Sequence, residues 1–574
     1  MNRKIPLWWG VSGIGALALA LRFTGLGHIQ TLVFDEVYYV PFALDYLQGT
    51  PSFDAHPPLG KYLIAVGIWL GQWPAAWLGW ATVEINGTLV SPLAFRWLNA
   101  LVGAALPVLL AALAWELGAT HSSYRGDRLP TTVEDPPKSP FLRATLKQLI
   151  TPLFNGGRGD LLTLRQHRFA LLAGLLMAME GLTLVESRLA LINIYGLALG
   201  LLGQWAWLRA RQSRHPARWR WVAGIALGAA VNVKWNWAGL WLGLLLWEIG
   251  FNRNPDSITS PKTPHPVGAN GCSPSEFTAI PPEFNPHCSQ MTPMRSGIAH
   301  RANTRANTSR ANKRLPLRLW PRWVAYLGAI PLAGRANNRL PLRPWPRWVA
   351  YLGAVPLATY MLLWLPHLAL TGESLGGIHR SLWSTHQSIG VNSSHTYCSP
   401  WHSWPLMARP VAYFFERSGQ GAEATATTLH AMGNPVLWWL STAAVLALAL
   451  GWLGRQIVAN PESAKISRRG AACCAPTTSA VVPFILLNYL ANWLPWALVS
   501  RCTFFYHAMG LATFGTLGLA WLMAQWLEKP RDRPLALLLL GAIALSFLFW
   551  LPLYLGLPIS PSALQHRWLL PGWI

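Results

Sequence analysis

The chain has 574 residues, of which 52% are hydrophobic and only 12% are charged. A soluble domain carries about 25% charged residues, so this composition excludes an ordinary soluble protein and indicates a polytopic membrane protein. The net charge of +24 does not require a nucleic-acid partner, because the basic residues cluster in short segments between apolar stretches, where cytoplasmic loops hold Lys and Arg.

Long apolar segments recur along the chain. A helix needs about 20 apolar residues to cross the hydrocarbon core of a bilayer. The sequence therefore predicts an all-α polytopic integral membrane protein with about 11 transmembrane helices. The expected spans cover residues 5–22, 94–117, 169–185, 189–208, 219–233, 236–250, 349–366, 435–454, 479–499, 505–526 and 534–555.

The N-terminal segment resembles a signal peptide, but its apolar run is long and no small-residue cleavage site follows. We therefore expect an uncleaved first span, with Arg3 and Lys4 in the cytoplasm. Every even-numbered connection then carries a basic cluster, as the positive-inside rule predicts for cytoplasmic loops. The N-terminus is expected in the cytoplasm and the C-terminus outside.

Two expected outer connections are long, at residues 23–93 and 367–434. Within the first, residues 61–80 are long enough to span the membrane, but Gly71 and Pro74 interrupt them and several Trp and Tyr rings suit an interfacial helix. Counting this segment as a span would also place the basic connection before residue 169 outside. We therefore interpret it as interfacial.

Residues 251–348 are rich in Pro, Asn, Ser and Arg, a composition typical of disorder. They contain KRLPLRLWPRWVAYLGAIPLA (313–333), which recurs almost unchanged as NRLPLRPWPRWVAYLGAVPLA (338–358). Two copies are too few for a solenoid; a local duplication without function and a basic patch on anionic lipid are the alternatives. We expect this cytoplasmic insert to separate an N-terminal catalytic membrane module (1–250) from a C-terminal membrane module (349–574).

The stretch LVFDEVYYV (32–40) places Asp35 and Glu36 side by side among apolar and aromatic residues, just after the first span. Desolvating a carboxylate is costly, and the chain has only 22 acidic residues. Ionisable residues at this depth are functional candidates. The pair is therefore the first candidate for catalysis.

Other outer connections also contribute ionisable residues. They are His56, Lys61 and Arg96 in and after the first loop, Glu186 and Arg188, Lys234, and Arg501 and His507. Simpler roles remain open: a lone cation can be a snorkelling anchor, Glu186 can pair with Arg188, His56 can be a turn residue, and Asp45 and Asp54 can be solvated.

A carboxylate and several cations near the lipid boundary suit group transfer from a lipid phosphate. The carboxylate would act as general base towards an acceptor hydroxyl, and the cations would stabilise the departing phosphate. No Gly-rich nucleotide-binding loop is evident. The six cysteines show neither metal-ligand spacing nor a readable disulfide framework.

Eight motifs, in order, resemble those of protein O-mannosyltransferases, which are polyprenol- or dolichyl-phosphate-mannose-dependent enzymes of the GT-C class and glycosyltransferase family 39. They are FDEVYY (34–39), HPPLGK (56–61), FRWLNALVGA (95–104), ESRLALINIYG (186–196), KWNWAG (234–239), HTYCSPWHSWPLMARPVAYF (395–414), GNPVLWW (433–439) and SRCTFFYHAMG (500–510). The basic insert, CSPW and the AMG ending depart from the family pattern. The second long outer loop has no β-trefoil-like repeat, so the short bacterial form is the nearer likeness.

The resemblance implies a GT-C fold and an inverting transfer of mannose from polyprenyl-phosphate-mannose to Ser or Thr hydroxyls of proteins. It assigns catalysis to Asp35, matching the family's first acid, and Glu36, and it leaves open which of the two is the base. Donor phosphate would be bound by Arg501, Lys234, Arg188 and His507. Bracing or acceptor-binding roles would fall to Arg96, His56, Lys61, His395, Tyr397 and Arg409.

The resemblance implies no cofactor and no metal site, although a metal requirement stays open. The expected partners are the lipid-linked donor, acceptor proteins and the bilayer, with no nucleic acid. The expected location is the plasma membrane, with the site facing the periplasm or exterior. Two rival functions remain. One is a GT-C enzyme that acts on a lipid or lipid-linked acceptor. The other is a lipid-linked sugar transporter or flippase, which would need charges along a membrane path and paired broken helices. A non-catalytic scaffold would leave Asp35 and Glu36 unexplained.

Overall fold

The computed structural model describes residues 7–123, 160–251, 347–388, 395–458 and 480–573, all of which belong to the same unit of the chain. The insert expected at 251–348 lies almost entirely outside the described residues, so the expected division into modules stays a prediction. Helices from both expected membrane modules pack together, α6 against α18 and α10 against α17.

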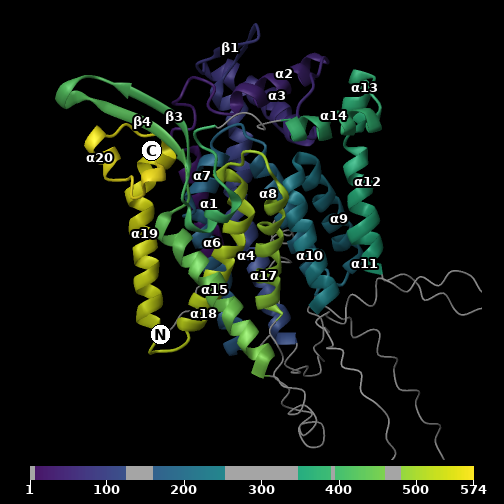
Figure 1. Ribbon diagram of the computed structural model, residues 1–574, viewed down its shortest axis with the longest axis vertical. Helices are drawn as coiled ribbons and strands as arrows, with labels where there is room; N and C mark the ends of the chain where they lie inside the picture. The colour runs from purple at the N-terminus through teal and green to yellow at the C-terminus, as the bar shows by residue number, and fades with distance from the viewer. Residues whose placement is uncertain (1–6, 124–159, 252–346, 389–394, 459–479, 574) are drawn as a thin grey trace, which may run out of the picture. The chain divides into compact units, whose positions relative to one another are not determined.

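The first part of the unit runs from α1 to α10 (Figure 1). Its elements are α1 (Leu7–Phe23), α2 (Glu36–Gln48), α3 (Leu59–Leu78), β1 (Val83–Ile85), β2 (Thr88–Val90), α4 (Pro92–Ser123), α6 (Asp160–Ala178), α7 (Gly181–Ser187), α8 (Asn193–Arg209), α9 (Pro216–Val233), the 3-10 turn η2 (Trp235–Trp237) and α10 (Ala238–Phe251).

The second part holds the remaining helices and a longer hairpin. Its elements are α11 (Arg347–Val349), the π-helical turn η5 (Ala350–Ala354), α12 (Val355–Leu362), α13 (Leu365–Thr371), α14 (Leu375–Ser388), η6 (Trp401–Leu406), β3 (Val411–Ser418), η7 (Gly421–Glu423), β4 (Thr425–Ala431), α15 (Pro435–Val458), α17 (Val481–Ala491), η8 (Leu494–Leu498), η9 (Phe505–Ala508), α18 (Met509–Trp526), α19 (Arg533–Leu555), α20 (Pro561–Gln565) and η10 (Pro571–Trp573).

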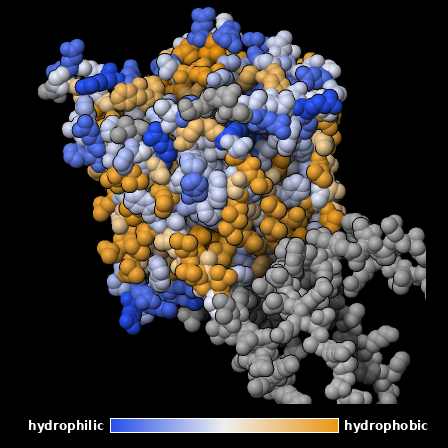
Figure 2. Space-filling model, in the orientation of Figure 1, coloured by the Kyte–Doolittle hydropathy of each residue, from blue (hydrophilic) through white to orange (hydrophobic). Residues whose placement is uncertain are grey.

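Six helical segments of the described chain are long and apolar enough to cross a membrane, and a seventh would join α6 to α7 across a bend. Each expected span contains a helix, but the count of eleven is not confirmed, because α1, α8 and α10 have only 17, 17 and 14 residues. The helix α3 is not among the candidate spans, but neither are α8, α9 and α10, so the interfacial interpretation stays a prediction. Figure 2 shows apolar residues over the middle of the visible face and hydrophilic residues gathered above and below them.

The expected span at 169–185 contains a bend of 60° between α6 and α7. Glu180 is the N-cap of α7, and its carboxylate accepts hydrogen bonds from the backbone of Leu182 (3.0 Å) and Thr183 (2.7 Å). A side-chain acceptor at the N-cap satisfies amide groups that a continuous helix would bond internally, and so starts a new helix. The buried α7 then leads through residues 188–192 into α8.

Close packing of α8 against η2 brings Asn193, at the start of α8, to Lys234, the residue before η2. A Cβ atom on Gly196 would lie 2.0 Å from the ring of Trp237, so only glycine permits this approach. Lys234 itself ends α9 in an extended conformation.

The outer-loop elements gather at one end of the helices (Figure 1): α2, α3, β1, the β3–β4 hairpin, α14 and α20, together with the C-terminus. The hairpin is antiparallel, from Val411 opposite Ala431 to Ser418 opposite Thr425, with a bulge between Ala412 and Phe414. A disulfide joins Cys398 to Cys502, with a Cα–Cα distance of 5.3 Å. The sequence alone did not reveal this pairing, because the two cysteines are 104 residues apart; the other four cysteines lie outside the described residues.

Candidate active site

Asp35 and Glu36 are adjacent in sequence but lie in different surroundings. Phe34 has a positive φ of 53°, which turns the chain immediately before Asp35, the N-cap residue of α2. Successive residues of a helix point about 100° apart. Glu36 is therefore fully buried, whereas Asp35 remains partly exposed.

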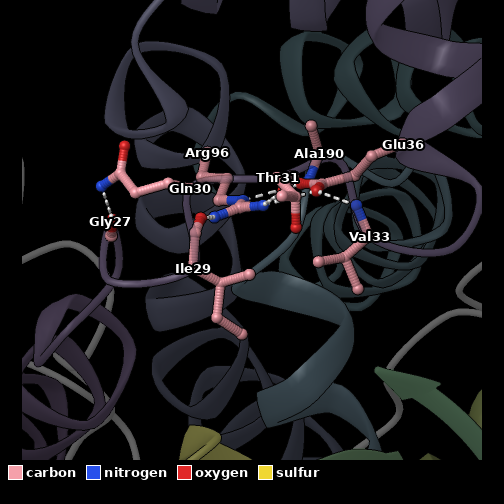
Figure 3. A network of polar contacts seen from close by, with 8 residues as sticks. All are labelled: Gly27, Ile29, Gln30, Thr31, Val33, Glu36, Arg96 and Ala190. Atoms are coloured by element: carbon pink, nitrogen blue, oxygen red, sulfur yellow. Dashed lines mark hydrogen bonds and ion pairs between the residues drawn. The ribbon is translucent and has the colours of Figure 1, made fainter. Parts of the chain in front are cut away.

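The Glu36 carboxylate is held by four hydrogen bonds (Figure 3). Arg96 on α4 donates from Nε to Oε1 (2.8 Å) and from Nη2 to Oε2 (2.6 Å). The backbone N–H groups of Val33 and Ala190 donate at 2.9 and 2.7 Å. Arg96 also donates to the carbonyl oxygens of Ile29 and Thr31. Glu36 and Arg96 therefore brace the first outer loop against α4 and the α7–α8 connection.

The Asp35 carboxylate, by contrast, accepts no hydrogen bond from any described residue. Burial raises the pKa of Asp35 to about 6, while the nearby Lys234 ammonium opposes this rise. A carboxylate with a pKa near neutrality is ionised at pH 7 and retains enough basicity to accept a proton. Of the two carboxylates, Asp35 is the one that no described donor occupies.

Asp54 and Lys61 form a buried ion pair, with exposed fractions of 10% and 3% for the two side chains. Lys61 Nζ also donates to the His56 carbonyl oxygen at 2.7 Å. The interpretation of Asp54 as a solvated acid is therefore wrong. Burial and the nearby Lys234 cation hold the pKa of His56 well below its usual value, so this imidazole is neutral.

A cavity of about 830 Å³ opens beside these residues. Its polar lining residues include His56, Lys234, His386, Gln387 and Arg501. Its apolar lining residues include Trp241, Leu242 and Leu245 of α10, and Ala491, Trp496 and Leu498. A molecule with an anionic head and a hydrocarbon tail has the complementary chemistry.

Lys234 and Arg501 are the cations of this cavity. Burial lowers the pKa of Lys234 to about 8, and Asp35 counteracts the effect. Lys234 Nζ lies 3.3 Å from Asn193 Oδ1 and 5.1 Å from the centre of the Tyr506 ring. Arg501 makes a long hydrogen bond of 3.5 Å to the Cys502 carbonyl oxygen. Both cations keep donors for a ligand.

Arg188 and His507 are placed differently. The Arg188 guanidinium donates to five backbone carbonyl oxygens, those of Leu21, Arg22, Thr24, Gly25 and Leu555. It therefore links the end of α1 to the end of α19, does not line the cavity, and does not pair with Glu186. His507 Nδ1 forms a hydrogen bond with the backbone carbonyl oxygen of Phe504, and the centre of its ring lies 4.4 Å from that of Trp496. His507 is also absent from the cavity lining.

The remaining candidates lie in the second long outer loop. Arg409 donates to the carbonyl oxygens of Thr396 and Gly572, and its guanidinium lies 5.6 Å from the centre of the Tyr397 ring. His395 is exposed, with its ring 5.1 Å from that of Phe504. The disulfide attaches this loop to the residue after Arg501.

Sequence reasoning missed four residues near the site: Asn193, His386, Tyr413 and Tyr506. Tyr413 donates a hydrogen bond to Glu186, which also accepts one from Asn193. Three of the four stand inside motifs quoted above, so the motifs carried a signal for them. His386 stands in no motif and reaches the cavity only through the folding of α14. Within the described residues, no group of three or more His, Cys, Asp or Glu is arranged to hold a metal ion.

Two family models match this chain. The model for dolichyl-phosphate-mannose-protein mannosyltransferase matches residues 13–123 and 141–262, and the model for the C-terminal four TMM region of protein-O-mannosyltransferase matches residues 373–573. The chain belongs to the protein O-mannosyltransferase family. The resemblance of the motifs is confirmed, and the protein is a glycosyltransferase.

Relatives of this mannosyltransferase cover nearly its whole length. The polyprenol-phosphate-mannose–protein mannosyltransferase of Mycolicibacterium smegmatis is 24% identical over 99% of this chain and 93% of its own. That of Corynebacterium glutamicum is 21% identical, over 98% and 93%. The structure of the Saccharomyces cerevisiae Pmt1-Pmt2 complex bound to the sugar donor matches 100% of this chain and 93% of that chain, with a TM-score of 0.61 and 14% identity. The GT-C membrane fold is thus confirmed.

We expect Arg96→Met to lower stability strongly, because Glu36 would remain buried without its cation. Breaking a buried pair from one side costs about 3–5 kcal/mol. The measurement is the thermal unfolding midpoint of the purified protein in detergent, with Arg380→Met on the exposed face of α14 as the control. The double variant Glu36→Gln/Arg96→Met should lose less than the sum of the two single losses. An unchanged midpoint in Arg96→Met would contradict the bracing role.

Proposed function

We propose that this mannosyltransferase transfers mannose from polyprenyl-phosphate-mannose to Ser or Thr hydroxyls of proteins, with Asp35 as general base and Lys234 and Arg501 at the donor phosphate. One observation carries the assignment of residues: the unpaired Asp35 carboxylate lies near Lys234, which lines, together with Arg501, a cavity that also has many apolar lining residues. The family and the names of its full-length bacterial relatives support the reaction.

The geometry suits an inverting displacement. The acceptor hydroxyl oxygen attacks the anomeric carbon of mannose from the side opposite the phosphate, and Asp35 takes the hydroxyl proton. The bond between the anomeric carbon and the phosphate oxygen breaks, and its electron pair leaves with the polyprenyl phosphate. Lys234 and Arg501 stabilise the negative charge that builds on this leaving group. Glu36 takes no proton, because Arg96 and two backbone amides already engage both of its oxygens.

The apolar residues that line the cavity suit the polyprenyl chain. Trp241, Leu242 and Leu245 stand along one side of α10, at spacings that bring their side chains together on a helix. His56 and His386 add polar groups to the lining. A neutral His56 would donate a hydrogen bond to sugar or phosphate oxygens without adding a further positive charge beside Lys234.

We further propose that the site faces the exterior at the plasma membrane. The positive-inside pattern places the first outer loop outside. The disulfide between Cys398 and Cys502, beside Arg501, supports this orientation, because disulfides persist in oxidising compartments.

Asp35→Asn should lower kcat about 10²–10⁴-fold, the usual contribution of a general base. The measurement is mannose transfer to a Ser/Thr-rich peptide in membranes supplied with polyprenyl-phosphate-mannose. Asp45→Asn is the matched control, since Asp45 lies in the same loop region and its side chain bonds only Ser52 among the described residues. Full activity in Asp35→Asn would overturn the base assignment, and transfer to lipid but not to peptide would favour the lipid-acceptor enzyme.

The pH profile of kcat/KM should be bell-shaped. Below pH about 6, Asp35 becomes protonated and cannot accept a proton, so activity falls. Above pH about 8, Lys234 loses its charge and binds donor phosphate less well, so activity falls again. The residual activity of Asp35→Asn should lack the acidic limb. A profile that is flat between pH 5 and 9 would contradict both assignments.

Lys234→Met and Arg501→Met should each lower kcat/KM for the donor by about 10²-fold or more, as expected for the loss of a group that stabilises transition-state charge. Steady-state kinetics against donor concentration measure the effect, with the exposed Arg380→Met as control. Wild-type kinetics in either variant would contradict the assignment of that cation to the phosphate site.

The orientation predicts which residues a membrane-impermeant thiol reagent reaches in intact cells. In a variant whose cysteines at 272, 288, 473 and 474 are replaced by Ser, Ser562→Cys on α20 should be labelled directly. Arg531→Cys, between α18 and α19, should be labelled only after permeabilisation. Both positions are exposed. The reverse pattern would place the site on the cytoplasmic face.

A further inference from the structure

The bulge in the β3–β4 hairpin turns one side chain towards the site. The register shifts between Ala412 and Phe414, so the intervening Tyr413 leaves the regular ladder. Tyr413 is buried and its ring stacks on that of Phe34, with centroids 4.0 Å apart and planes 12° apart. Phe34 is the residue before Asp35. Bulges of this kind commonly aim a side chain at a functional site.

The Tyr413 hydroxyl begins a buried chain of hydrogen bonds. It donates to Glu186 Oε1, and Asn193 Nδ2 donates to Glu186 Oε2 at 3.1 Å. The Asn193 amide oxygen then accepts from Lys234 Nζ at 3.3 Å. The four residues are between 0% and 7% exposed, so water does not replace these bonds.

The direction of each hydrogen bond in this series is set by Glu186 and by Lys234. Glu186 accepts on both oxygens, which turns the N–H end of the Asn193 amide towards the carboxylate. The oxygen end is thereby left for the Lys234 ammonium, which can only donate. The amide thus stands between a carboxylate and a cation that make no direct ion pair in the structure.

This separation matters because Lys234 has a flexible stem and a compact charge. A direct ion pair with Glu186 would occupy the ammonium and offset its charge at short range. Through Asn193, the ammonium is oriented while its other two N–H groups stay available to the cavity. The charged groups that act on Lys234 are Asp35, Arg501, Glu186 and Asp54, and Glu186 is the one linked to it by hydrogen bonds through an intermediate residue.

We infer that Tyr413 and Glu186 are positioning residues that act through Asn193 on Lys234, so that the outer-loop hairpin sets the direction of the cation at the donor phosphate. The stacking of Tyr413 on Phe34 connects the same hairpin to the segment that carries Asp35. The inference rests on the proposed function, since it takes Lys234 as a donor-phosphate group.

Tyr413→Phe and Glu186→Gln test this role with little change of shape. Tyr413→Phe keeps the ring that stacks on Phe34 and removes the hydroxyl. Each variant should raise the KM for polyprenyl-phosphate-mannose about tenfold, the equivalent of one charge-linked hydrogen bond, with a smaller effect on kcat. Glu186→Gln should also move the alkaline limb of the pH profile to lower pH, because the loss of a nearby negative charge makes Lys234 easier to deprotonate.

Tyr195→Phe is the matched control. It removes another buried hydroxyl, which donates to Asn99 Oδ1 at 2.7 Å on the same helix as Asn193 but outside this chain of bonds. It should leave the donor KM and the pH profile unchanged. The double variant Glu186→Gln/Lys234→Met should lose no more activity than Lys234→Met alone.

The outcomes separate this inference from the proposed function. If Lys234→Met has a wild-type donor KM and kcat/KM, the phosphate site fails and the inference fails with it. If Lys234→Met is impaired but Tyr413→Phe and Glu186→Gln keep the wild-type donor KM and alkaline limb, the inference alone is overturned. Additive losses in the double variant would likewise overturn it, because they would show that Glu186 acts independently of Lys234.

Discussion

The buried ion pair between Glu36 and Arg96 is the interaction on which the candidate site depends. A fully buried carboxylate is tolerated only with a cation and hydrogen bonds to its oxygens. Glu36 obtains them from three places in the chain: Arg96 on α4, the amide of Val33, and the amide of Ala190 after α7. Arg96 in turn holds the carbonyl groups of the first loop. One carboxylate thus fixes the loop that presents Asp35.

At the outer end of the molecule, some charged side chains are occupied by protein partners and others remain available. The donors of Arg188 are directed at backbone carbonyls, and Asp54 is paired with Lys61. Asp35 has no donor from the described chain, and Lys234 and Arg501 have weak or long protein contacts. Lys234 and Arg501 line a cavity that also has many apolar lining residues, and Asp35 lies near Lys234. Burying these charges without full partners costs stability, which is the usual consequence of keeping groups ready for a ligand.

The sequence indicated the fold class and the central acids, but it did not predict several features of the structure. Apolar segments predicted where helices stand, yet not that Glu180 would cap a new helix and bend the chain by 60°. Cys398 and Cys502 gave no pairing signal, because their contact depends on how two distant loops fold together. His386 reaches the cavity only because α14 packs over it. The bulge that aims Tyr413 inward is a detail of register, which strand patterning does not specify.

By itself, the sequence determined the membrane setting, the family and the position of the Asp35–Glu36 pair, because hydropathy, charge distribution and local motifs are properties of short segments. The tertiary structure decided the surroundings of each member of that pair. Whether a carboxylate is a brace or an available base depends on which donors surround it, and those donors come from residues up to 154 positions away, as with Ala190 and Glu36. Local sequence does not encode such distances; the packing of α2, α4 and the α7–α8 connection does.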